Sequence, residues 1–503
     1  MTLTGDGARG ERSTQVDLSS DQFRELGHRL VDRVADFLAS LPSGPVTVAA
    51  SPSDVRQGLP PEDRLPDAGT APGPLLDEIT DHLFAKSLFN GHPRFFGYIT
   101  SSAAPLGILG ELLAAAVNPN VGAWKLSPVA TEVEAQTVRW IADLIGVPTT
   151  CGGLLVSGGN MANIVCFLAA RTAKTSWDVG KTGVRGSGAA LRVYGSTETH
   201  TWIQKAADLS GIGTDAIRWV ETDDHHRINV SALRAEIERD RAEGHRPFMV
   251  VGTAGTVGTG AVDPLPEIAA VCREYDLWFH VDGAYGAFAA KAPGAPADLA
   301  GIGDADSVAV DPHKWLYAPL EAGCVLVRRP SDLTNTFSYH PSYYNFEETE
   351  TNYVDFGLQN SRGFRALKVW LTLRQVGRTG CLEMIAGDCR LAERLHRVIR
   401  EHASFEAFTQ SLSITTFRYV PQDLRAGLGT ADVEQYLDRL NQQLLTAVEQ
   451  SGELFLSNAL VGGRFALRAC IVNFRTTDAD IDAVPTLVAR LGEQADTTTH
   501  DRP

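Results

Sequence analysis

Between Ala104 and Gln375 the chain alternates short apolar runs with helix-like stretches, and this alternation constrains the fold more than any other feature. Six of the runs have the length of a strand: LLVS, LRVYGS, FMVVGTA, LWFHVD, SVAVD and CVLVRR. Such alternation is typical of an α/β domain, in which helices flank a sheet with parallel strands. Ligands of these sheets bind at the carboxyl ends of the strands, so the polar residues that follow each run are the candidates for function.

The segments on either side of this region have other patterns. In residues 1–103 a polar tail precedes two amphipathic helices, which a connector rich in Pro and Gly separates. These helices cannot form a core alone, so we expect them to pack on another part of the molecule or on a second subunit. Helical stretches and strand-like runs after Gly380 predict a small α+β domain. The predicted domains are therefore 1–103, 104–376 and 377–503.

Composition and charge exclude several classes of function. The net charge of −16 disfavours a nucleic-acid partner and an anionic membrane surface. No apolar run approaches the ~20 residues of a membrane helix, and the polar N-terminus does not resemble a secretory signal. The seven cysteines are scattered, without a CxxC pair or zinc-like spacing, so we expect neither disulfides nor a metal. The sequence thus predicts a cytoplasmic protein.

The segment SVAVDPHKWLYAPLEAGCVLV places a lysine at the carboxyl end of a predicted strand. Apolar neighbours favour the neutral amine of a lysine, so Lys314 is a candidate for an imine-forming nucleophile. In LWFHVDGAYGAFA, Asp282 likewise ends an apolar run, and an anionic partner of this kind suits a pyridinium nitrogen. The small Ala284 would let a flat ring lie against the backbone. The alternatives are a surface lysine and an aspartate that caps a turn.

Three further segments carry weaker signals. In SGGNMANIVCF, the backbone N–H groups of Gly159 and Asn160 at the start of a helix predict a phosphate site, although Asn160 could equally be a plain N-cap. His200 follows a strand-like run, where its ring could stack on a pyridine ring or simply face solvent. Thr256, in TAGTVGTG, could hydrogen-bond a ring substituent or belong to a turn.

The order of these motifs resembles that of the group II pyridoxal-phosphate decarboxylases, and within them most of all the aromatic L-amino acid decarboxylases. The match rests on SGGN, His200, TAGT, HVDGAY and DPHKW, and it covers nearly the whole chain. The resemblance implies a fold-type I α/β domain with a mostly parallel seven-stranded sheet, pyridoxal 5′-phosphate as the cofactor, no metal and an amino-acid substrate. It also implies a homodimer whose N-terminal helices clasp the partner.

The family's roles carry over to matching positions of this chain. Lys314 corresponds to the lysine that forms the Schiff base, and Asp282 to the partner of the ring nitrogen. His200 corresponds to the stacking histidine, and Ala284 to the small residue on the opposite face of the ring.

Other positions match less specific parts of the family's site. Gly159 and Asn160 fall in the phosphate turn, His313 lies beside the lysine, and Thr256 matches a threonine beside the ring. The family also has a mobile loop with a tyrosine that donates a proton to the substrate carbon, and the resemblance assigns this role to Tyr353 in ETETNYVDFGLQ.

The expected substrate pocket departs from that of aromatic-specific relatives. Tyr98 keeps an aromatic wall, but Ile99 and Thr100 stand where those relatives have Phe and Pro, and Gly122 replaces an aromatic residue of an animal relative. Ser361 resembles a serine of plant members that prefer phenolic substrates. An aromatic substrate is therefore expected, with tyrosine, Dopa, phenylalanine and tryptophan all open.

Three alternatives remain at this point. The chain could decarboxylate a non-aromatic amino acid, for example glutamate, diaminobutyrate or an aliphatic one. It could be an oxygen-dependent aldehyde synthase, although the presence of both Tyr353 and His200 favours simple decarboxylation. A non-catalytic scaffold protein that retains the fold is the third alternative.

Overall fold

The computed structural model describes residues 14, 16–59, 64–186, 188–341, 350–500 and 502. The chain divides into two compact units, one of residues 1–44 with 50–88 and one of residues 45–49 with 89–503. The first unit therefore ends before the predicted boundary at 103, and the second contains both of the other predicted domains. None of the helices in the described ranges has the length and apolar character that crossing a bilayer requires.

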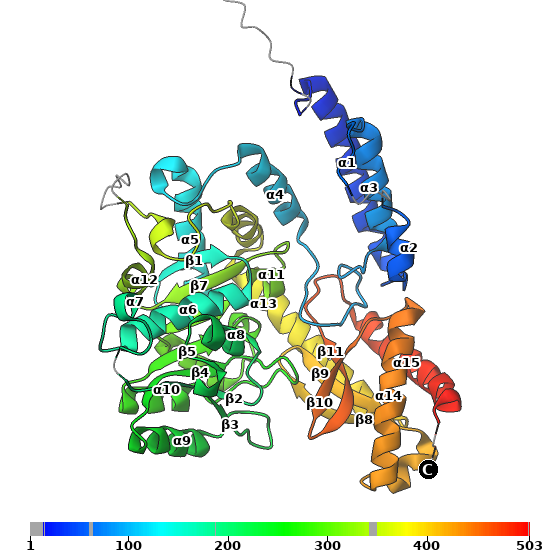
Figure 1. The fold of residues 1–503 in the computed structure, drawn as a ribbon. Coiled ribbons are helices and arrows are strands. Elements are labelled where there is room, and N and C mark those ends of the chain that lie inside the picture. The colour runs from blue at the N-terminus through cyan, green and yellow to red at the C-terminus, as the bar shows by residue number, and fades with distance from the viewer. Residues whose placement is uncertain are drawn as a thin grey trace, which may run out of the picture. The chain divides into compact units, whose positions relative to one another are not determined.

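The first unit is a small helical assembly made of α1 (Ser20–Ser40), α2 (Pro52–Arg56) and α3 (Pro72–Lys86). A capping box of Ser19 and Gln22 starts α1, as the polar cluster in the sequence predicts. The rings of Phe37 and Phe84 stack with their centroids 4.2 Å apart, which holds α1 beside α3 (Figure 1). Both predicted N-terminal helices are thus present.

The second unit is built on a seven-stranded sheet in the order β1-β7-β6-β5-β4-β2-β3. Strand β7 runs antiparallel to its neighbours β1 and β6, and the other pairs are parallel. The mostly parallel sheet is therefore confirmed. The strands are β1 (Gly152–Val156), β2 (Leu191–Ser196), β3 (Ile217–Val220), β4 (Arg246–Thr253), β5 (Trp278–Asp282), β6 (Ser307–Val310) and β7 (Gly323–Val327).

Helices cover both faces of this sheet because successive strand residues point to opposite sides. Leu155 and Val250 join a core with α5, α9 and α10, whereas Leu154 and Val251 join a core with α6, α8 and α12 (Figure 1). The helices of this region are α4 (Pro105–Val117), α5 (Pro128–Ile145), α6 (Gly159–Lys174), α7 (Val179–Thr182), α8 (Trp202–Leu209), α9 (Val230–Ala242), α10 (Leu265–Tyr275), α11 (Pro312–Trp315) and α12 (Pro330–Phe337).

The C-terminal part has a four-stranded antiparallel sheet, which confirms the small α+β fold. Helix α13 leads into it and is interrupted at Gly377, where φ is +71°, one residue after the predicted boundary at 376. The sequence patterns predicted two of the four strands and missed β8, β10 and the last helix. The elements are α13 (Ala366–Glu401), β8 (Phe405–Ser411), β9 (Ile414–Tyr419), α14 (Ala431–Ser451), β10 (Ser457–Val461), β11 (Arg464–Cys470) and α15 (Asp478–Thr498).

Candidate active site

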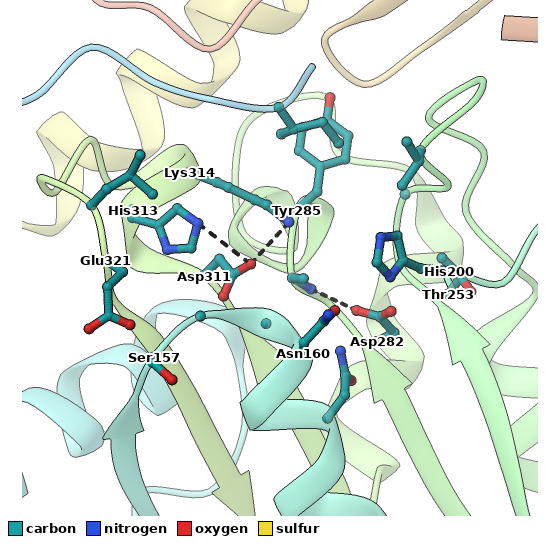
Figure 2. A pocket seen from close by; sticks show the side chains of 18 of the residues that line it. Ser157, Asn160, His200, Thr253, Asp282, Tyr285, Asp311, His313, Lys314 and Glu321 are labelled. Atoms are coloured by element: carbon teal, nitrogen blue, oxygen red, sulfur yellow. Dashed lines mark hydrogen bonds and ion pairs between the residues drawn. The ribbon is translucent and has the colours of Figure 1, made fainter. Parts of the chain in front are cut away.

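A cavity of about 400 Å³ lies at the carboxyl edge of the parallel strands (Figure 2). Its walls come from the segments that follow β1, β2, β4, β5 and β6 and from the residues that precede β7. Because parallel strands end at the same edge, residues far apart in the sequence meet there. Eight of the predicted site residues line the cavity: Ile99, Gly159, Asn160, His200, Asp282, Ala284, His313 and Lys314.

Lys314 is carried by α11, a short helix directly after β6. Its Nζ lies 3.0 Å from Oδ2 of Asp311, a buried carboxylate at the end of the strand. The neighbouring His313 is held by its backbone, since its carbonyl accepts a 2.8 Å hydrogen bond from Oγ of Ser101. Burial lowers the pKa of the His313 imidazole, so the ring is neutral near pH 7. A single cation, the lysine, thus faces the buried carboxylate.

Asp282 is the last residue of β5, and its carboxylate is oriented by two donors. Oδ2 accepts a 2.7 Å hydrogen bond from the indole Nε1 of Trp202, and Oδ1 accepts one of 3.2 Å from the backbone N–H of Ala284. Behind this pair, His280 bonds to Asn163 and Ser307, and burial lowers its pKa to about 4. The neutral His280 leaves Asp282 without an adjacent charged histidine.

The N-terminus of α6 opens directly onto the cavity. Its N-cap is Gly158, with φ of +84° and no side chain to occupy the first N–H groups of the helix. At Gly159 a Cβ atom would lie 2.6 Å from Oδ2 of Asp311, so a larger residue there would displace this carboxylate. Free N–H groups at the positive end of a helix dipole form an anion site, which suits a phosphate.

His200 stands on the other side of the view from Lys314, next to Asp282 (Figure 2). Its Nδ1 accepts a 3.3 Å hydrogen bond from the backbone N–H of Trp202, which fixes the ring. Partial desolvation lowers the pKa of the imidazole. The ring is therefore neutral near pH 7, and a neutral imidazole can lie against an aromatic ring.

The residues of the cavity fit pyridoxal phosphate. They offer an amine, an oriented carboxylate, an uncapped helix N-terminus and a small residue, Ala284. Two buried oxygens on the wall, Oγ1 of Thr253 and Oδ1 of Asp311, have no hydrogen-bond partner within the described chain. Since buried polar atoms are seldom left unpaired, these two oxygens are available to a polar ligand.

The chain is similar to known proteins in both sequence and fold. Residues 52–420 match the model of the pyridoxal-dependent decarboxylase conserved domain. The chain belongs to this family. It is 33% identical over 487 residues to an aromatic-L-amino-acid decarboxylase of Bacillus atrophaeus. This alignment covers 96% of this chain and 98% of the relative. It is 30% identical to a phenylacetaldehyde synthase of a Rosa hybrid cultivar, over 90% of each chain.

The fold agrees with this membership. A solved structure of Oryza sativa TDC with PLP and tryptamine superposes with a TM-score of 0.88 at 27% identity, covering 96% of this chain and 99% of that one. The chain is thus a pyridoxal-phosphate-dependent amino-acid decarboxylase, and the cofactor predicted from the sequence is confirmed.

One predicted cofactor contact of the decarboxylase needs correction. Thr256 does not line the cavity, because its Oγ1 is buried 3.0 Å from Oγ1 of Thr259 and accepts a hydrogen bond from the N–H of Ala261. The chain turns sharply after β4, with φ of +92° at Gly255, and this turns Thr256 inward. Thr253 lines the cavity instead. Thr253 lies opposite Asp282 in the register of β4 and β5, and this pairing cannot be read from the sequence.

Tyr353 is not brought to the cavity either. It lies in a short 3₁₀ helix, Tyr353–Asp355, and its side chain is only 2% exposed. The guanidinium of Arg362 lies 4.7 Å from its ring centroid, and burial raises the pKa of the phenol well above its usual value. The backbone N–H of Val354 bonds to the carbonyl of Gly122, which ties the segment to the chain before α5. Residues 342–349, just before it, lie outside the described residues.

The expected substrate pocket is only partly assembled by this chain. Ile99 lines the cavity, whereas Thr100 does not, and Tyr98 is 58% exposed with φ of +51°. A Cβ at Gly122 would lie 2.2 Å from the carbonyl oxygen of Asn360, so this glycine meets backbone rather than a ligand.

Ser361 is exposed and also lies away from the cavity. The apolar lining comes instead from Ile99, Val257 and Leu320. Val257 follows β4 and Leu320 precedes β7, two strands that β5 and β6 separate in the sheet.

Proposed function

We propose that this decarboxylase converts an aromatic L-amino acid to the corresponding amine and CO₂. The observation that carries the proposal is the meeting of Lys314, Asp282 and the uncapped N-terminus of α6 around one cavity. The relatives named for aromatic substrates support the choice of substrate class.

The cofactor-binding roles follow from where each side chain lies. Lys314 would bind the aldehyde carbon of the cofactor, Asp282 its ring nitrogen, and the N–H groups of Gly159 and Asn160 its phosphate. When bound, pyridoxal phosphate supplies a ring that takes up the electron pair left when the substrate carboxylate departs as CO₂. Asp282, whose oxygens are already oriented by Trp202 and Ala284, would hold a proton at the ring nitrogen.

The remaining side chains of the cavity have positioning roles. Neutral His200 provides a flat surface on one side of the cavity, and Ala284 leaves room on the wall that it lines. Asp311 holds the amine of Lys314 through a 3.0 Å contact. This contact keeps the lysine within the cavity when it is not bound to the cofactor. Tyr353 is not among the described residues that line the cavity.

Charge on the cavity wall supports a neutral substrate side chain. Ile99, Val257 and Leu320 offer apolar surface, while the carboxylates of Glu198 and Glu321 also line the cavity. Among the described lining residues, Lys314 is the one lysine or arginine. A substrate with an acidic side chain would meet carboxylates without a cationic partner, which disfavours glutamate. Aliphatic and basic substrates remain to be tested.

An aldehyde synthase is the second candidate. Its support is the burial of Tyr353, because the sequence argument for simple decarboxylation relied on this phenol at the reacting carbon. The similarity to a phenylacetaldehyde synthase also supports this second candidate.

Product analysis separates these functions. The cofactor-loaded protein is incubated with single L-amino acids, and the amine, aldehyde, ammonia, CO₂ and peroxide are measured. We expect an aryl-alkylamine and CO₂ in equal amounts from an aromatic substrate. Aldehyde with ammonia and peroxide would instead establish the synthase, and amine from glutamate or an aliphatic amino acid would overturn the aromatic assignment.

We further propose a homodimer. Helix α4 exposes four large apolar side chains on one face: Leu109, Leu112, Leu113 and Val117. Its other face, with Gly107, Gly110 and Ala114, is buried. Contiguous apolar surface of this kind marks an interaction site, and a second copy of the chain is the partner that the family resemblance favours.

We also retain a cytoplasmic location as a proposal. All seven cysteines are free thiols and six of them are buried, which suits a reducing compartment. Cell fractionation with an antibody against the chain would test this, and recovery from a secreted or membrane fraction would contradict it.

A further inference from the structure

Helix α11, which carries Lys314, needs support from the rest of the molecule. It has only four residues, and no side chain caps its N-terminus. A single helical turn is unstable by itself, because its formation restricts several residues for one hydrogen bond. The position of the Lys314 amine therefore depends on what holds the residues around it.

A buried carboxyl group on α13 holds two of those residues. Oδ2 of Asp388 accepts a 2.8 Å hydrogen bond from the indole Nε1 of Trp315 and one of 2.7 Å from the hydroxyl of Tyr317. Trp315 directly follows Lys314, and Tyr317 lies two residues further on. Asp388 is 4% exposed and Trp315 is fully buried, so water does not compete for these bonds.

The backbone at Tyr317 adopts an unfavourable conformation, which other contacts must hold in place. Its φ of +54° lies in the left-handed region, which is unfavourable for a bulky side chain. Its N–H bonds to the carbonyl of Lys314 at 3.3 Å, and its own carbonyl accepts the N–H of Ala104 at 2.8 Å. The hydrogen bond to Asp388 fixes the hydroxyl of Tyr317. The residue that follows α11 is therefore held by both its backbone and its side chain.

Trp315 extends the support to the cavity wall. Its ring stacks on Tyr285, with centroids 4.7 Å apart and planes 18° from parallel. Tyr285 lines the cavity, and its hydroxyl lies 2.6 Å from Oγ of Ser413. Asp388 thus contacts both the segment that carries the reacting amine and, through Trp315, the wall beside it.

We propose that Asp388 is a positioning residue for Lys314, acting through Trp315 and Tyr317. The inference rests on the decarboxylase function and deepens it, because it assigns a residue of α13 to the placement of the reacting amine. The simpler alternative is that Asp388 only satisfies two buried donors and so contributes to stability alone. The two roles predict different values of kcat for a variant that lacks the carboxyl group but regains stability: positioning predicts a low kcat, and a role in stability alone predicts that kcat recovers.

The experiment compares Asp388→Asn, Asp388→Ala, Tyr317→Phe and the double variant Asp388→Ala/Tyr317→Phe with the native chain. Four quantities are measured: the Tm of the cofactor-free protein, the Kd for pyridoxal phosphate by absorbance titration, kcat and KM. Asp240→Asn, which also weakens an ion pair with Arg218, is the control for a loss of stability away from the cavity. Asp240 is also buried and accepts a 2.7 Å hydrogen bond from a tyrosine, Tyr194, but neither residue lines the cavity.

Positioning predicts a loss of kcat that does not follow stability. Asp388→Asn keeps an acceptor oxygen and should retain kcat and Kd within about 3-fold. Asp388→Ala should lower kcat by about 10-fold or more and weaken cofactor binding, since small displacements of a reacting group are costly. The double variant lacks the Tyr317 hydroxyl, so it has one fewer buried donor without a partner than Asp388→Ala. Its Tm should therefore recover in part while kcat stays low.

The inference is overturned if kcat and Kd follow Tm through the whole series, or if Asp388→Ala is as active as the native chain below its Tm. If Asp388→Ala does not fold, Tyr317→Phe tests the inference, because this variant retains the carboxyl group. A several-fold fall in its kcat at a Tm near that of the native chain supports positioning. A native kcat overturns the inference. A native chain that binds pyridoxal phosphate but decarboxylates nothing would refute the proposed function, whereas the Kd series would still test Asp388.

Discussion

The indole of Trp202 donates a 2.7 Å hydrogen bond to the carboxylate of Asp282, and both side chains are buried. Trp202 comes from α8, on one face of the sheet, and Asp282 from the end of β5. The bond fixes one oxygen of the carboxylate, while the N–H of Ala284 fixes the other. The partner of the cofactor's ring nitrogen is therefore oriented by the protein itself.

This relationship predicts the effect of Trp202→Phe. Losing a hydrogen bond to a charged group costs about 1.5–3 kcal/mol, so pyridoxal phosphate should bind at least 10-fold more weakly. Absorbance titration of the cofactor-free protein measures this. Trp370→Phe is the control, because it removes an indole hydrogen bond to a neutral side chain, Gln136, away from the cavity. Equal affinities of both variants would show that Trp202 does not support Asp282.

The two threonines after β4 should respond in opposite ways. Thr253→Val removes an oxygen that has no partner in the described chain, so it should affect cofactor affinity and leave Tm unchanged or higher. Thr256→Val breaks buried hydrogen bonds with Thr259 and Ala261 and should cost about 1–3 kcal/mol of unfolding free energy with little change in affinity. Thermal melts and cofactor titrations of both variants check this, and the reverse pattern would restore the sequence-based role of Thr256.

Tyr353→Phe should be nearly neutral for the reaction. The ring would keep its contact with Arg362, and the lost hydroxyl does not reach the cavity. We expect amine formation within about 2-fold of the native rate and no aldehyde. A loss of 100-fold or more, or a change of product to aldehyde, would reinstate Tyr353 as the proton donor.

The same assay on Tyr343→Phe and Tyr344→Phe covers the other tyrosines of this stretch. Both positions lie outside the described residues. A loss of amine formation in one of these variants, with Tyr353→Phe active, would show that another phenol supplies the proton.

Stability should depend on pH through Asp388. Burial raises the pKa of this carboxyl group to about 7, whereas an exposed aspartate titrates near 3.9. Between these values the folded chain keeps a proton that the unfolded chain has lost, so this group makes the fold less stable as pH rises. The unfolding free energy of Asp388→Asn, relative to the native chain, should therefore increase from about pH 4 to about pH 7 and then level off.

Denaturant unfolding of the two cofactor-free proteins at several pH values measures this difference. Asp263, another buried carboxyl group whose pKa is raised to about 7, is present in both proteins and cancels. A difference that is flat with pH would mean that Asp388 is ionised throughout.

The apolar face of α4 predicts the oligomeric state. Leu112→Glu combined with Leu113→Glu places two charges on side chains that are more than half exposed, so the fold should tolerate them. If a second copy covers this face, the mass measured by light scattering should fall from that of a dimer to that of a single chain. Leu209→Glu, on a side chain that is 76% exposed on α8, is the control and should leave the mass unchanged.

The sequence by itself determined six of the seven strands of the large sheet and the main groups of the site. The alternation of strand and helix patterns is local, and parallel strands end at one edge, so the sequence predicts that Lys314, Asp282, His200 and Gly159 lie together. Asp282 ends its strand, and the other three residues follow their strands by three or four positions.

Tertiary structure alone decided which neighbouring side chains face the cavity. Thr253 rather than Thr256 lines it because of where β4 ends and how the chain turns at Gly255. The burial of Tyr353 and the pairing of Asp388 with Trp315 depend on contacts between residues far apart in the sequence. A periodic pattern places an element to within a few residues, but the direction of a side chain changes with every residue of a strand or turn. Packing between distant elements then selects one direction.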